Sequence, residues 1–205
     1  DWQMIKNVVF DIGMVLVDFN WRGVMANLGF TEEETEKVGG VILSELWNDL
    51  DRGVMPEKEV TDMMKKQIPG YEEKFDMFWK YLYDTIEIFP YSVEWVKSMK
   101  DRGYNTYLLS NFPQGFYQNS EEHYFDFMPY IDGKIISSHV KCIKPEAEIY
   151  EKLLQTYDLK AEECVFFDDR ADNVAGAKTV GINAIHFTDF EEAKAQFEEL
   201  VRSME

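Results

Sequence analysis

The stretch Val8-Val9-Phe10-Asp11-Ile12-Gly13 joins an apolar run to a carboxylate, and it is the segment from which the fold can be read. The run from Ile5 to Phe10 has the length of a strand and is rich in β-branched residues, so it predicts a buried β-strand. Asp11 follows at the point where that strand is expected to end. In open α/β sheets, ligands bind at the carboxyl ends of the strands, so Asp11 is a candidate functional residue.

Three further stretches have the same local form, in which apolar strand residues lead to a polar group. They are Leu108-Leu109-Ser110-Asn111, Lys144-Pro145 and Val165-Phe166-Phe167-Asp168-Asp169, of which the lysine follows a predicted strand by a short loop. Because the carboxyl ends of parallel strands meet at one edge of a sheet, we expect these polar groups to converge on Asp11.

The rest of the chain divides into a helical block and an alternating region. From about residue 20 to 86, Thr31-Glu32-Glu33-Glu34 is a capping box, Val41 to Leu50 and Tyr71 to Ile86 carry helical apolar patterns, and Pro56 begins a further helix. Beyond it, strands are predicted at Tyr104 to Leu109, Lys134 to Ser137, Cys164 to Phe167 and Ile182 to His186. Helices are predicted near 91–102, 114–122, 146–157, 172–179 and 191–204.

This alternation predicts an α/β fold, namely a doubly wound, Rossmann-like parallel sheet with helices on both faces. The helical block separates the first strand from the others, so we expect it to be an inserted α-helical cap. We place the α/β catalytic core at residues 1–16 and 88–205 and the cap at 17–87.

Composition restricts the possible partners. The 205 residues carry a net charge of -18, which argues against nucleic acid because binding that backbone needs a cationic face. No membrane-spanning run or signal peptide is visible, and the two cysteines form no CxxC motif, so we expect a cytoplasmic protein with no membrane partner. The expected partner is a small phosphorylated metabolite, and the sequence makes no prediction of an oligomeric state.

The polar groups at the strand ends suit phosphoryl transfer. A carboxylate such as Asp11 can attack phosphorus and form an aspartyl-phosphate, and Mg²⁺ would bring the two anions together. Asp11, Asp169 and the Gly13 carbonyl can supply oxygen ligands to that ion. The hydroxyl of Ser110, an amide N–H at Asn111 and the ammonium of Lys144 can bind the phosphoryl oxygens.

These motifs resemble those of the haloacid dehalogenase superfamily, and in particular its phosphatases with a small helical cap after the first strand. The resemblance extends to the sugar-phosphatase branch that includes the α-D-glucose-1-phosphate phosphatases. It rests on Phe10-Asp11-Ile12-Gly13-Met14-Val15-Leu16-Val17-Asp18, Leu109-Ser110-Asn111, Lys144-Pro145-Glu146-Ala147 and Phe166-Phe167-Asp168-Asp169-Arg170-Ala171-Asp172-Asn173. It implies Asp11 as nucleophile, phosphate binding by Ser110 and Lys144, and Mg²⁺ held by Asp11, Asp169 and the Gly13 carbonyl, with Asp168 reaching the ion through water.

The chain departs from the family pattern at Gly13, where most superfamily phosphatases have a second Asp that protonates the leaving group. General acid catalysis typically accelerates a reaction by ~10²–10⁴-fold. A different residue that donates the proton to the leaving group would therefore affect the rate strongly. Asp18 and a residue of the cap are the first candidates for that donor. Gly13 itself either tolerates an Asp or is required for a backbone angle closed to residues with a Cβ.

Several other residues are candidates for the site, with ordinary structural roles as the alternative. Asp172 can pair with Arg170, and Asn173 can orient a neighbour. In the cap, the candidates for contact with substrate are Trp21, Arg22, Trp47 and Arg52.

Two other functions remain open. One is a 2-haloacid dehalogenase, which uses an Asp nucleophile at carbon without a metal. The Asp168-Asp169 pair argues against it, since a metal-free site has no use for that charge density. The other is a non-catalytic protein that binds a phosphorylated ligand, which Gly13 would permit.

Overall fold

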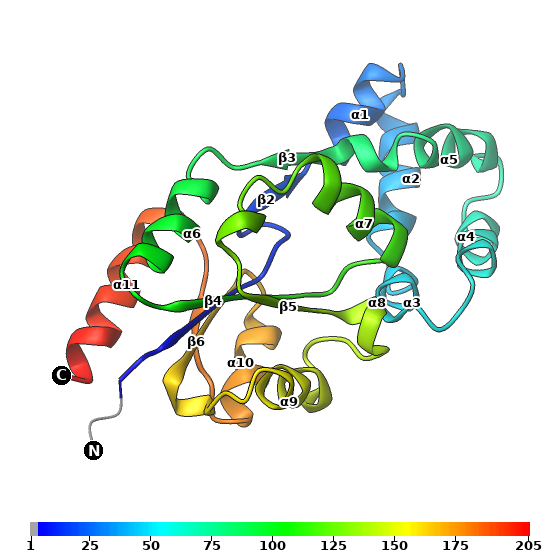
Figure 1. Ribbon diagram of the computed structural model, residues 1–205. Coiled ribbons are helices and arrows are strands. Elements are labelled where there is room, and N and C mark those ends of the chain that lie inside the picture. The colour runs from blue at the N-terminus through cyan, green and yellow to red at the C-terminus, as the bar shows by residue number, and fades with distance from the viewer. Residues whose placement is uncertain (1–3) are drawn as a thin grey trace.

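The structure, a computed structural model, describes residues 4–205 and is built on a five-stranded parallel sheet of order β5-β4-β1-β6-β7 (Figure 1). Its strands are β1 (Asn7–Phe10), β4 (Asn105–Ser110), β5 (Gly133–Ile136), β6 (Cys164–Asp168) and β7 (Asn183–His186). The central strand, β1, pairs with β4 on one side and β6 on the other, so the chain's first strand has neighbours from far along the sequence.

Helices cover both faces of this sheet, because the strands are apolar on both sides. Helices α6 (Ser92–Asp101) and α11 (Phe190–Ser203) pack on the face that carries Phe10, whose ring lies 4.8 Å from that of Trp95 in α6. Helices α9 (Ala147–Thr156) and α10 (Ala171–Thr179) cover the other face (Figure 1). There the ring centroid of Tyr150 lies 6.1 Å from that of Phe166. The predicted doubly wound α/β fold is confirmed.

The helical cap, residues 20–85, is inserted between two short antiparallel strands that the sequence analysis did not predict, β2 (Val17–Phe19) and β3 (Ile86–Ile88). The capping box at Thr31 is confirmed, because its side chain accepts from the Glu34 amide and the Glu34 side chain accepts from the Thr31 amide. The cap contains α1 (Trp21–Asn27), α2 (Glu32–Ile42), α3 (Trp47–Arg52), α4 (Glu57–Lys66), α5 (Glu72–Trp79) and η1 (Leu82–Thr85).

Two predicted helices of the cap were wrong in extent. A helix over Val41 to Leu50 was expected, but α2 ends at Ile42 and α3 begins at Trp47. Ser44 Oγ donates to the Val41 carbonyl at 2.7 Å, and such local side-chain bonds compete with a continuing helix. The pattern from Tyr71 to Ile86 likewise divides into α5, η1 and the start of β3.

The remaining elements connect the sheet to its helices. They are α7 (Gln114–His123), η2 (Met128–Tyr130), the four-residue α8 (Ser137–Val140) and η3 (Ala161–Glu163). Cys142 and Cys164 are buried free thiols. Each helix in residues 4–205 is too short or too polar to cross a bilayer. The division of the chain into a core of residues 1–16 and 88–205 and a cap of residues 17–87 stays a prediction. Residues 1–3 of that predicted core lie outside the described part of the chain.

Candidate active site

The candidate site lies where three adjacent strands end. Asp11 directly follows β1, Ser110 is the last residue of β4, and Asp168 is the last residue of β6. Because β1 lies between β4 and β6, the sheet itself brings these positions together. The carboxylate oxygens offered by Asp11, Asp168 and Asp169 all lie within 4.8 Å of one another. The convergence expected from the strand ends is therefore observed.

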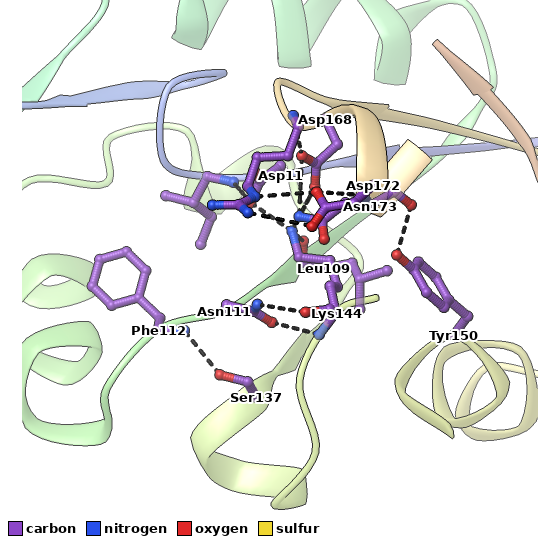
Figure 2. A network of polar contacts seen from close by, with 12 residues as sticks. Asp11, Leu109, Asn111, Phe112, Ser137, Lys144, Tyr150, Asp168, Asp172 and Asn173 are labelled. Atoms are coloured by element: carbon purple, nitrogen blue, oxygen red, sulfur yellow. Dashed lines mark hydrogen bonds and ion pairs between the residues drawn. The ribbon is translucent and has the colours of Figure 1, made fainter. Parts of the chain in front are cut away.

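Lys144 joins this cluster from the loop before α9, with a side chain that is only 1% exposed. Its Nζ lies 2.9 Å from Asp11 Oδ1 and 2.7 Å from Asp168 Oδ2, and it donates to the Leu109 carbonyl at 3.1 Å. Figure 2 shows these groups gathered in one polar network. A buried ammonium fixed by three oxygens is rigidly positioned at the edge of the sheet.

A second set of contacts holds Lys144 and Asp168 in place. Asn111 Oδ1 accepts from the Lys144 amide at 2.9 Å, and Asn111 Nδ2 donates to the Lys144 carbonyl at 3.2 Å. Asp168 accepts from the Arg170 amide at 2.8 Å and from Asn173 Nδ2 at 3.2 and 3.3 Å (Figure 2). Asn173 is thus an orienting group, as considered from the sequence.

Burial makes the cluster electrostatically demanding. Burial, together with the charge of Asp168, raises the pKa of Asp11 well above its usual range, although Lys144 opposes the shift. Burial and Asp168 also raise the pKa of Asp169. Burial would lower the pKa of Lys144, but Asp11 and Asp168 outweigh it and hold that pKa above its ordinary value. The carboxylates repel one another, and one ammonium only partly relieves the repulsion.

This donor set fits a divalent cation with a preference for oxygen. Three carboxylates against one ammonium leave two formal negative charges in a small, mostly buried volume. Mg²⁺ binds proteins through one or two carboxylates and retains several waters. Asp11 and Asp169 can supply the carboxylates, whereas both oxygens of Asp168 already accept hydrogen bonds.

A cavity of about 400 Å³ opens above the cluster, between the sheet edge and the cap. Asp11, Gly13, Ser110, Lys144 and Asp169 line its floor. A Cβ built on Gly13 would meet nothing within 4 Å, and its φ lies outside the left-handed region. The expectation that Gly13 could be required for its backbone angle is wrong.

The wall of the cavity above this floor carries several aromatic rings together with polar side chains of the cap, Ser44, Asn48 and Asp51. The ring of Phe19 lies 5.9 Å from that of Trp47 and 5.8 Å from that of Phe116. The apolar lining residues include Val17, Phe19, Ile42, Leu43, Trp47, Ile86, Phe112 and Phe116. The cavity therefore has a charged floor and an upper part in which aromatic and aliphatic side chains lie beside a few polar groups of the cap.

The other candidates from the sequence have varied outcomes. Of the four cap residues considered for substrate contact, Trp47 lines the cavity. Trp21 packs against Gly39, Arg22 pairs with Glu36 and Arg52 pairs with Glu146. Asp172 lines the cavity and pairs with Arg170 at 3.2 Å.

One lining residue, Asp51, was missed by the sequence analysis. It lies on α3, is 5% exposed, and follows Trp47 by four positions, so the two share one face of the helix. The available signal was a carboxylate on the otherwise apolar Trp47–Leu50 side of a predicted helix. A buried acid on such a face needs an explanation, because burying an unpaired charge is costly.

Comparison with known proteins finds one matching family. A model of haloacid dehalogenase-like hydrolases matches residues 5–181. The chain is 29% identical over 188 residues to the sesquiterpene phosphatase astK of Aspergillus oryzae, covering 90% of each protein. It is 25% identical over 191 residues to the D-ribitol-5-phosphate phosphatase of Bacteroides thetaiotaomicron, covering 87% of this chain and 89% of that one.

A solved structure shows the same architecture. A predicted HAD-like family hydrolase from Porphyromonas gingivalis superposes with a TM-score of 0.72 at 23% identity, covering 95% of this chain and 98% of the other. At this identity the likeness concerns the fold.

Proposed function

Because the chain belongs to the haloacid dehalogenase-like hydrolases, we propose that it hydrolyses a small phosphomonoester through an aspartyl-phosphate on Asp11, with Mg²⁺ as cofactor. The observation that carries this proposal is the gathering of Asp11, Asp168 and Asp169 around Lys144 at the ends of adjacent strands. The phosphatase activity named for two relatives supports it.

The contacts of Asp11 suit a nucleophile. Its Oδ1 accepts from the Ile12 amide at 2.8 Å and from Lys144 at 2.9 Å, so the carboxylate is held in one orientation. The Asp11 carboxylate also lies beside that of Asp169, and its Oδ2 is the oxygen that we assign to the attack on phosphorus. Attack forms the bond between this oxygen and phosphorus and breaks the bond to the leaving alcohol; water then cleaves the aspartyl-phosphate and returns Asp11.

Ser110 and Lys144 suit the phosphoryl oxygens. Both line the cavity floor beside Asp11, and both are fixed by their strand ends or backbone contacts. Both polar atoms of the Asn111 side chain are hydrogen-bonded to the backbone of Lys144. The group of Asn111 that we propose for phosphate binding is therefore its backbone N–H. Donors fixed in advance stabilise charge in the transition state without reorganising.

Asp11, Asp169 and the Gly13 carbonyl are the proposed Mg²⁺ ligands, and Asp168 is proposed to act through water and to hold Lys144. When bound, the ion would neutralise the repulsion between the phosphoryl group and these carboxylates. The two formal negative charges left over by Lys144 support a divalent ion at this place.

The Asp11→Asn variant tests the nucleophile, measured with p-nitrophenyl phosphate and Mg²⁺. We expect turnover to fall to background, because an amide cannot form the aspartyl-phosphate. Asp126→Asn, the same change on the exposed surface, should retain wild-type turnover. Wild-type rates in Asp11→Asn would contradict the mechanism.

The alternatives lead to different results in the same assays. A 2-haloacid dehalogenase would release halide from 2-chloropropionate in EDTA, which the acidic cluster argues against. A non-catalytic binding protein would bind phosphorylated compounds in Mg²⁺ without turnover.

The aromatic rings of the wall favour one substrate class. A sugar phosphate, the substrate that the resemblance to the sugar-phosphatase branch implies, would present hydroxyls that need hydrogen-bonding partners. The rings of Phe19, Trp47 and Phe116 instead suit the phosphate ester of an apolar alcohol. The similarity to a protein named sesquiterpene phosphatase supports this choice.

A chain-length series tests the substrate class. Each buried methylene contributes about 0.8 kcal/mol, so kcat/KM should rise about fourfold per methylene from ethyl to octyl phosphate until the wall is filled. Trp47→Ala should reduce kcat/KM for octyl phosphate and leave that for ethyl phosphate nearly unchanged. A preference for glucose 1-phosphate or ribitol 5-phosphate over every alkyl phosphate would restore the sugar-phosphate interpretation.

A further inference from the structure

We propose that Asp51, on helix α3 of the cap, is the general acid that protonates the leaving oxygen in place of the acid absent at Gly13. This inference rests on the proposed phosphatase function and adds a catalytic residue to it. In the second step the Asp51 carboxylate takes a proton from the attacking water, which restores its starting state.

Position is the first argument. In phosphoryl transfer, the attacking and leaving oxygens lie roughly in line through phosphorus. Asp11 attacks from the floor of the cavity, so the leaving oxygen faces the cap. Asp51 is the one titratable residue that the cap contributes to the lining of this cavity, counted over residues 4–205.

The backbone of Asp51 is fixed to the core, which gives its carboxyl a defined place. Ser137 Oγ donates to the Asp51 carbonyl at 2.6 Å while accepting from the Phe112 amide at 2.9 Å. Lys141 Nζ donates to the Gly53 carbonyl at 2.7 Å. A Cβ on Gly53 would lie 3.0 Å from that of Ser138, so α3 approaches α8 very closely.

The Asp51 carboxyl group is protonated, as a proton donor must be. Burial raises the pKa of Asp51 to about 8, although the charge of Lys144, the side chain of Trp47 and the charge of Arg170 lower it. The acid is therefore protonated near neutral pH. Its Oδ1 is buried and has no hydrogen-bond partner among the described residues, which favours the neutral, protonated form of this carboxyl.

Other acids near the cavity do not fit this role. Asp172 pairs with Arg170, and that hydrogen bond lowers its pKa, so it is ionised at neutral pH. Asp18, a candidate from the sequence, is not among the lining residues, whereas its neighbours Val17 and Phe19 are. Along a strand, alternate side chains point to opposite sides.

The test compares leaving groups in Asp51→Asn. An alkyl phosphate leaves as a strongly basic alkoxide and needs the proton, so kcat should fall at least about 100-fold. An aryl phosphate leaves without help, so kcat for p-nitrophenyl phosphate should fall by less than about threefold. Asp49→Asn, the same change on the same helix but outside the cavity lining, should leave both rates unchanged.

Wild-type protein supplies a second measurement that does not depend on how the variant folds. Its kcat for an alkyl phosphate should decrease as pH rises through about 8, while kcat for the aryl phosphate should not. Equal losses on both substrates in Asp51→Asn, or identical pH profiles in wild type, would overturn the role of Asp51 and leave the phosphatase function standing. Wild-type protein inactive on both substrates would overturn both proposals.

Discussion

Arg52 on the cap helix α3 and Glu146 at the start of α9 form a two-bond ion pair. Arg52 Nη1 lies 3.0 Å from Glu146 Oε1, and Nη2 lies 2.9 Å from Oε2. Glu146 Oε1 also accepts from the Ile143 amide at 2.9 Å, so the pair ties the cap to the loop that carries Lys144. The two sides of the cavity are thereby connected next to Asp51 and Lys144.

Breaking the Arg52–Glu146 ion pair should weaken the attachment of the cap to the Lys144 loop only modestly. Both side chains are about a third or more exposed, and such pairs contribute up to about 1 kcal/mol, so Arg52→Gln should lower kcat/KM by at most roughly fivefold. The charge exchange Arg52→Glu with Glu146→Arg should recover part of the loss. A loss in the single variant that is insensitive to salt would contradict an electrostatic origin.

Removal of metal should abolish turnover and lower stability. EDTA should stop hydrolysis, and Mg²⁺ should restore it. Mg²⁺ should also raise the melting temperature of wild type in a concentration-dependent way, because a ligand that binds only the folded state stabilises it. Asp169→Asn should need more Mg²⁺ for the same shift. Equal shifts in wild type and Asp169→Asn would exclude Asp169 as a ligand.

The protonation of Asp51 should affect the pH dependence of the free energy of unfolding, which can be measured without any substrate. Its pKa of about 8 in the folded protein exceeds the ordinary value, so between about pH 5 and 8 the folded state holds a proton that the unfolded state has lost. The free energy of unfolding should therefore fall by about 1.4 kcal/mol per pH unit as pH rises through this window, from this group alone. Urea denaturation of wild type and Asp51→Asn at several pH values isolates the effect as their difference. A difference that stays constant with pH would contradict the raised pKa, and Asp49→Asn provides the control.

Introducing the absent acid should be structurally tolerated. Gly13→Asp places its Cβ in open space at the cavity floor, so the variant should fold, with a melting temperature near that of wild type when Mg²⁺ offsets the added negative charge. In the Asp51→Asn background it should raise kcat for alkyl phosphates by about tenfold or more, because it supplies a second source of the proton. Weaker Mg²⁺ binding, measured by titration, would show that the added carboxylate acts on the metal site instead. No gain on alkyl phosphates despite a folded protein would contradict the interpretation.

The sequence predicted the floor of the site because each residue there follows a strand whose apolar run is visible. Asp11, Ser110 and Asp168 lie at the ends of such runs, and parallel topology brings those ends together. The strands β2 and β3 were missed because three residues are too few to show an alternating pattern.

The cap side of the site could not be predicted in the same way. Asp51 gains its significance from α8 and the Lys144 loop, which lie far along the chain, and no local pattern indicates their contact with α3. The break between α2 and α3 is accompanied by a hydrogen bond from the Ser44 hydroxyl to the Val41 carbonyl, a contact that the apolar pattern of the sequence does not reveal.

The central place of β1 has a consequence for how the protein is made. Asn7 meets Asn105 and Cys164, which are 98 and 157 positions away, so the first strand of the sheet to be made waits for partners that are made much later. Until β4 and β6 have been made, Val8, Val9 and Phe10 have no strand partners for their backbone and no sheet to pack into. A nascent or truncated chain that ends before β6 leaves one edge of β1 open to other molecules. We therefore expect the yield of refolding to depend strongly on protein concentration, and the newly synthesised chain to be a substrate for chaperones.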